Sequence, residues 1–90
     1  MAQTAAGSMN MGKVVIPVRV EPLEEGGYLA ICDVIQGCHA EGETVAEALE
    51  YIEDVARVLL ELQREEGLPL DPIFDGVEPD AVIKARLVED

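Results

Sequence analysis

The sequence predicts an α+β fold in which a mostly antiparallel sheet carries one long helix on one face, in the order β-β-β-α-β. Apolar residues alternate with a period of two in residues 13–21 and again in 81–89, which is typical of strands. Between these segments, residues 44–66 change to the three- and four-residue spacing of a helix. With 90 residues, the chain has room for one domain.

The first strand, KVVIPVRVE, places Val14, Ile16, Val18 and Val20 on one face. Pro17 lies in its middle and has no backbone N–H to donate to a neighbouring strand. We therefore expect this strand to lie at an edge of the sheet or to carry a bulge at Pro17.

Two shorter strands are expected next. The turn PLEEGG at 22–27 leads into a strand at 28–33, and a short connection leads to a third strand at 38–41. The expected core, which also draws on the helix, comprises Val14, Ile16, Val18, Leu29, Ile31, Ala48, Leu49, Ile52, Ala56 and Leu59.

The helix has clear signals at both ends. Thr44 and Glu47 have the spacing of a capping box, and Gly67 followed by Pro69 predicts the stop. A proline-containing connector at 68–80 then leads to a fourth strand at 81–89.

The helix also carries a second apolar stripe beside the one expected to face the sheet. Tyr51, Val55, Val58 and Leu62 follow one another at steps of four, three and four residues. Such a stripe either wraps around the sheet or contacts another subunit. We predict a dimer or higher oligomer, with Tyr51, Val58 and Leu62 at its interface.

The charge of the chain restricts its partners. Six Lys and Arg stand against 19 Asp and Glu, and the net charge is −13. Such a field repels phosphate backbones and anionic membranes, so we expect no direct nucleic-acid binding and no membrane binding, and it favours a basic partner. The alternative is that the acids only maintain solubility. The candidate partner-binding residues are Glu50, Asp54 and Glu61 on the helix and Pro17 on the first strand.

The sequence shows neither a secretory signal nor a membrane-spanning segment. Residues 1–12 lack a secretory signal pattern and are expected to form a flexible leader, while residues 13–90 form one domain. No apolar run approaches the roughly 20 residues that span a bilayer. We therefore expect a cytoplasmic protein in which Cys32 and Cys38 stay reduced.

No residue pattern points clearly to catalysis. Cys38 and the single histidine, His39, are neighbours, but consecutive strand residues point to opposite faces, so they would diverge. Cys32 and Cys38 lack the spacing of a zinc or redox motif. We predict a protein that is not an enzyme and has no cofactor or metal. The alternative is a small enzyme that uses Cys38 or His39.

Residues 27–49, GYLAICDVIQGCHAEGETVAEAL, resemble the HicB-like antitoxin family. The resemblance is carried by Tyr28, Gly37, Cys38, Gly42, Thr44, Glu47 and Ala48. Asp33-Val34 stands where the family usually has a proline and an acid. The resemblance implies a partial ribonuclease-H-like fold and a small, basic, HicA-like toxin that cleaves RNA as the partner. Many members of the family carry a C-terminal DNA-binding segment; because this sequence ends at Asp90, we expect the short form without it.

Two functions therefore follow from the sequence. The first is an antitoxin-type protein that binds and neutralises such a toxin. The alternative is an orphan homo-oligomeric module with a structural or ligand-binding role.

Overall fold

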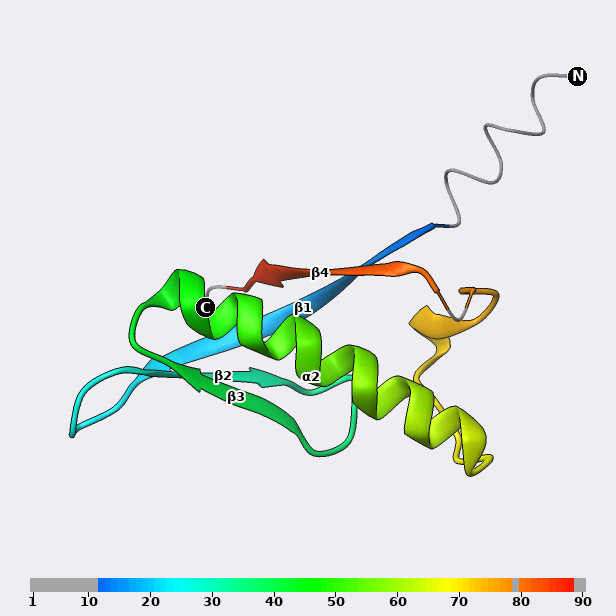
Figure 1. Cartoon of the computed structure of the whole chain (residues 1–90), viewed down its shortest axis with the longest axis horizontal. Coiled ribbons are helices and arrows are strands. Elements are labelled where there is room, and N and C mark those ends of the chain that lie inside the picture. Colours follow the sequence, from blue (N-terminus) through cyan, green and yellow to red (C-terminus); the bar gives the residue numbers. More distant parts are fainter. Residues whose placement is uncertain (1–11, 79, 89–90) are drawn as a thin grey trace, which may run out of the picture.

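The computed structural model describes residues 12–78 and 80–88 and has two layers, a four-stranded sheet and a long helix on one of its faces (Figure 1). The expected leader therefore lies outside the described residues, apart from residue 12. In chain order the elements are β1 (Lys13–Pro22), β2 (Tyr28–Cys32), β3 (Cys38–Gly42), α2 (Val45–Glu65), the 3-10 helix η1 (Pro72–Phe74) and β4 (Val82–Leu87). This order confirms the α+β fold that the sequence predicts.

The strands follow the order β3-β2-β1-β4 across the sheet. β1 pairs antiparallel with β2, and β2 pairs antiparallel with β3, but β1 and β4 are parallel. The parallel pair follows from the helix: α2 returns the chain along the sheet after β3, so β4 runs in the direction of β3 and β1. The chain thus crosses over two strands to reach the free side of β1.

The core lies between α2 and the sheet. Side chains that are almost fully buried come from alternate positions of β1 and β2 and from one stripe of α2: Val14, Ile16, Val18, Ala30, Cys32, Ala48, Ile52, Ala56 and Leu60. Leu49 and Leu59 are half-buried and flank this cluster.

The expected inward face of β2 is wrong. Arg19 pairs with Ile31, and Glu21 pairs with Leu29. Paired residues share a face of the sheet, so Ile31 and Leu29 lie on the face opposite α2. Ala30 and Cys32 fill the core instead.

The expected edge position of β1 is also wrong, because β1 lies between β2 and β4. The backbone carbonyl of Val18 accepts from the N–H of Val88 at 2.9 Å, so Val18 directs its backbone groups toward β4. Pro17, the preceding residue, directs its backbone to the other side. The pairing with β2 begins only at Arg19, so the missing N–H of Pro17 costs the sheet no ladder bond.

The two ends of α2 confirm the stop and start signals. The Glu47 N–H donates to Thr44 Oγ1 at 3.0 Å, while Glu47 Oε1 accepts from the N–H of Glu43 at 2.8 Å, one residue before the expected partner. At the other end, the N–H groups of Gly67 and Leu68 donate to the carbonyls of Arg64 and Gln63, which is a Schellman motif.

The connector after α2 is tied to the helix. Arg64 Nη2 donates to the carbonyl of Val77 at 3.1 Å, and Phe74 from η1 is buried. In the described part of the chain, no helix is both long enough and apolar enough to cross a membrane.

α2 also protects the outer edge of β4. Ala85 directs its N–H away from β1, and Glu53 Oε2 accepts from this N–H at 2.8 Å. The Ala85 N–H, which an added strand would need for pairing, is therefore already bonded to a helix side chain.

Candidate functional site

The outer face of α2 is the strongest candidate site. Ala48, Ile52, Ala56 and Leu60 turn inward, so the stripe of Tyr51, Val58 and Leu62 turns away from the sheet. These three side chains are 45%, 58% and 46% exposed. Val55, which the sequence also placed on this stripe, is instead half-buried against the core. We call Tyr51, Val58 and Leu62 the apolar stripe.

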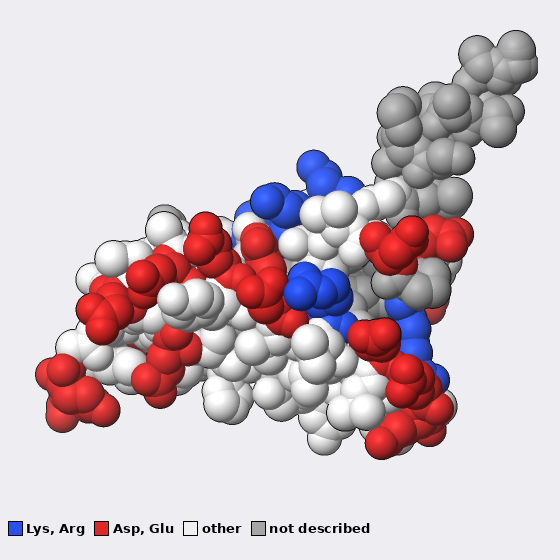
Figure 2. Space-filling model, in the orientation of Figure 1, with Lys and Arg blue, Asp and Glu red and all other residues white. Residues whose placement is uncertain are grey.

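Acidic side chains run beside the apolar stripe. Glu50, Asp54 and Glu61 are exposed, and the helical spacing places them together along the crest of α2. Red atoms follow the helix in the space-filling view (Figure 2). Asp54 Oδ1 lies 3.3 Å from Arg57 Nη1, but both side chains are more than half exposed, so solvent screens this pair. We call Glu50, Asp54 and Glu61 the acidic ridge.

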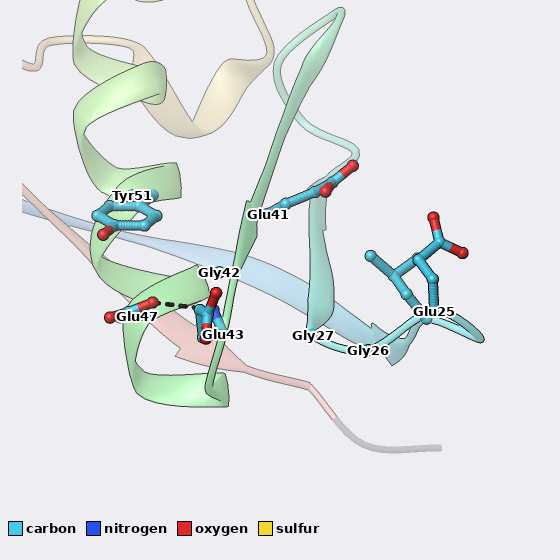
Figure 3. Close-up of a pocket in the computed structure, with 9 residues that line it drawn as sticks. Glu25, Gly26, Gly27, Glu41, Gly42, Glu43, Glu47 and Tyr51 are labelled. Atoms are coloured by element: carbon cyan, nitrogen blue, oxygen red, sulfur yellow. Dashed lines mark hydrogen bonds between the residues drawn. The ribbon is translucent and has the colours of Figure 1, made fainter.

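A hollow of about 470 Å³ lies at the N-terminal end of α2. Four acidic residues, a run of backbone and one aromatic ring contribute to its lining, from Glu25, Gly26, Gly27, Glu41, Gly42, Glu43, Glu47 and Tyr51, together with Leu23. The carboxylates of Glu25 and Glu41 point away from Glu47 and Tyr51 (Figure 3). Its walls come from the β1–β2 turn, the end of β3 and the first turns of α2. Tyr51 connects this acidic hollow to the apolar stripe.

Local structure explains how the hollow keeps its shape. A Cβ on Gly42 would lie 2.5 Å from the backbone nitrogen of Ala48, so only glycine lets β3 approach the start of α2 this closely. Glu47 is held by its bond to the Glu43 N–H and cannot turn freely. The remaining three acidic residues, Glu25, Glu41 and Glu43, are exposed.

The motif that carries the family resemblance is mostly structural. Tyr28 packs against the core, Cys38 is buried, Gly37 has a φ of +77°, and Thr44 caps the helix. These residues build the β2–β3–α2 junction. The exposed residues of the acidic ridge and apolar stripe lie outside the strongest part of the motif.

Pro17 does not join the other candidate residues. It belongs to β1 and to the face of the sheet opposite α2, because its neighbours Ile16 and Val18 point into the core. The acidic hollow was also not predicted. Glu41, Glu43 and Glu47 are close in the sequence, but Glu25 comes from the β1–β2 turn, which only the pairing of β2 with β3 brings beside them. No local pattern could have revealed that the two segments meet.

The two cysteines lie directly opposite each other on β2 and β3, and both are buried. A hydrogen bond between the two side chains lowers the pKa of Cys32 and raises the pKa of Cys38. His39 is exposed on the other face of β3, so the strand separates it from Cys38 as expected. Among residues 12–78 and 80–88, no group of three or more His, Cys, Asp or Glu side chains could hold a metal ion.

Comparison with known proteins finds relatives of this chain among the UPF0150 proteins. The chain is 34% identical over 68 residues to UPF0150 protein ssl0738 of Synechocystis sp., covering 72% of this chain and 94% of that protein. It is also 36% identical over 44 residues to UPF0150 protein ssr1765 of the same organism, covering 49% of this chain and 56% of that protein. No family model matches the sequence.

Proposed function

This chain belongs to the UPF0150 family, and we propose that it is a HicB-like, antitoxin-type protein that binds and neutralises a small, basic, RNA-cleaving toxin. The observation that carries the proposal is the apolar stripe on α2 with the acidic ridge beside it. The resemblance of residues 27–49 to HicB-like antitoxins supplies the class of partner.

The apolar stripe supports binding of another protein. Exposed Tyr51, Val58 and Leu62 lie in one row along the helix, whereas isolated apolar residues are common on any surface. Aromatic and aliphatic side chains of this kind anchor interfaces once water is excluded around them.

The charges around the stripe favour a basic partner over a second copy of the chain. Pairing two α2 helices through their stripes would bring two acidic ridges together, and like charges across an interface oppose association. A basic protein would face Glu50, Asp54 and Glu61 with opposite charge. The acidic hollow would accept a Lys or Arg side chain, with the ring of Tyr51 at its wall.

A pull-down from the native host tests the proposal. Wild-type protein is compared with a variant carrying Tyr51→Ala, Val58→Ser and Leu62→Ser, and with a control carrying Ile73→Ser, an exposed apolar position on η1 outside the apolar stripe. We expect a small basic protein to be retained by the wild type and the control but not by the stripe variant. Purified, it should cleave RNA, and an equimolar amount of wild-type chain should stop the cleavage.

Two results would count against the proposal. One is that no small basic RNA-cleaving protein is retained. The other is that cleavage by the retained protein continues unchanged in the presence of the wild-type chain, which would favour the orphan module.

A further inference from the structure

The face of the sheet opposite α2 is apolar at its centre and uncovered by any element of residues 12–78 and 80–88. Strand alternation places Val15 and Pro17 of β1, Leu29 and Ile31 of β2, and Val82 of β4 on this face. Val15 is 43% exposed and Val82 is 55% exposed. We call this surface the open sheet face.

The open sheet face differs in charge from the rest of the molecule. Lys13, Arg19, Lys84 and Arg86, four of the chain's six basic residues, lie on it. Its acids are Glu21, Asp33 and Glu41, so cations and acids nearly balance here in a chain of net charge −13. Arg19 binds two of these acids, with N–O distances of 3.0 Å to Glu21 and 3.2 Å to Asp33.

This balance matters for contact between two copies of the chain. Two strongly acidic molecules repel each other through most of their surfaces, and most of all through their acidic ridges. At the open sheet face, where cations and acids nearly balance, this repulsion is weakest and apolar side chains are available for burial.

Contact through the outer edge of β4 or through the unpaired part of β1 is less suitable. At the outer edge of β4, Glu53 already occupies the N–H of Ala85. At the part of β1 not paired with β2, Pro17 has no N–H to donate. Both features oppose extension of the sheet by a strand from another copy.

We propose that two copies of this chain pack face to face through their open sheet faces, around a two-fold axis that lies between the two sheets and oblique to the strands. Lys13, Lys84 and Arg86 lie beside the first half of β1, whereas Glu21 and Glu41 lie at its other end. An oblique axis places the cationic end of one copy over the acidic end of the other, and the strands of the two sheets then cross at a large angle. An axis along the strands would keep the cations away from Glu41. The proposal is independent of any toxin partner.

The test compares two matched substitutions in the full chain. Val15→Glu introduces an acid at the centre of the open sheet face, and Val58→Glu introduces the same acid at an exposed position on α2. The mass of each protein is measured by sedimentation equilibrium over a concentration series, with circular dichroism as a check of folding. We expect a dimer for the wild type and for Val58→Glu, and a monomer for Val15→Glu.

A second variant separates loss of the contact from loss of the fold. Lys84→Glu combined with Arg86→Glu leaves the apolar centre unchanged but makes the face strongly acidic, and both positions are exposed. We expect this variant to be monomeric with an unchanged circular dichroism spectrum. The proposal is overturned if the wild type is monomeric at the highest concentration, if Val58→Glu dissociates the dimer, or if the folded Lys84→Glu, Arg86→Glu variant remains a dimer.

Discussion

At the scale of single residues, Gly42 makes the tightest demand on the fold. Its φ is not in the left-handed region, so conformational freedom does not explain the glycine. The reason is space: a Cβ would lie 2.5 Å from Ala48 N and 2.9 Å from Ala48 Cα, and both are backbone atoms. Neither can move aside in the way that the end of a flexible side chain can.

We therefore expect Gly42→Ala to destabilise the protein by about 1–3 kcal/mol, as overpacking does. The control is Gly76→Ala, where φ is +76° but the added Cβ meets no atom within 4 Å. The control should be destabilised only by the strain of a left-handed conformation at a residue with a Cβ, roughly 1 kcal/mol. Urea denaturation of both variants measures the difference, and a loss at Gly42 no larger than at Gly76 would contradict the steric explanation.

Residue patterns in β2 also show where prediction from the sequence ends. Tyr28, Ala30 and Cys32 on one face are apolar, and so are Leu29 and Ile31 on the other. A strand with two apolar faces does not reveal which one is buried. The decision comes from its register with β1, whose alternation is clear, and that register is a property of two strands at once.

At the scale of elements, the strands and the helix could be predicted because each has its own period. β1 and β4 show period two over most of their length, and α2 is bounded by Thr44 and Gly67. The position of β4 beside β1, and hence the interior position of β1, depends on the path of the chain after α2. No local pattern carries that information, which is why Pro17 suggested an edge strand.

The contact between α2 and β4 allows a prediction at this scale. Glu53→Ala leaves the N–H of Ala85 without its acceptor, and we expect a loss of roughly 1–3 kcal/mol. Glu53→Gln keeps an acceptor oxygen and should lose less. Glu61→Ala, on the exposed crest of the same helix, should change stability by no more than about 0.5 kcal/mol.

Thermal and urea denaturation of these three variants provide the measurement. Hydrogen exchange at the Ala85 N–H should also accelerate in Glu53→Ala, because the edge is then open to water. Equal stability of Glu53→Ala and Glu61→Ala would show that the bond contributes nothing to the fold.

At the scale of the whole molecule, the charge distribution separates two surfaces. Acids dominate α2 and the hollow at its start, while cations gather on the sheet side, and blue atoms are visible at the upper margin of the molecule near β4 (Figure 2). The net charge was evident from the sequence, but this separation was not. It arises because Lys84 and Arg86 of β4 join Lys13 and Arg19 of β1 across a parallel pair.

The same distribution predicts that the chain alone does not bind duplex DNA tightly. Binding depends on cations that neutralise phosphates, and the four cations of the open sheet face share it with Glu21, Asp33 and Glu41 in a chain of net charge −13. We expect no shift of duplex DNA by low micromolar protein in a gel. A shift that weakens with added salt would contradict this expectation.

The acidic ridge predicts the kinetics of binding to the proposed toxin. Attraction between the acidic ridge and a basic protein acts over long range and mainly increases the rate of encounter. Dissolved salt screens it over a Debye length of about 8 Å at physiological ionic strength. The association rate should therefore fall as salt rises, whereas the apolar stripe should mainly govern dissociation.

A charge reversal tests this division directly. The variant Glu50→Lys, Asp54→Lys, Glu61→Lys should associate more slowly and lose most of its salt dependence, while its fold is unchanged because all three side chains are exposed. The matched control, Glu24→Lys, Asp75→Lys, Glu78→Lys, changes the net charge by the same amount at positions away from α2. Stopped-flow binding at several salt concentrations measures both. If the two variants slow association equally, only the net charge matters; if neither does, the acids act on solubility and the stripe alone drives binding.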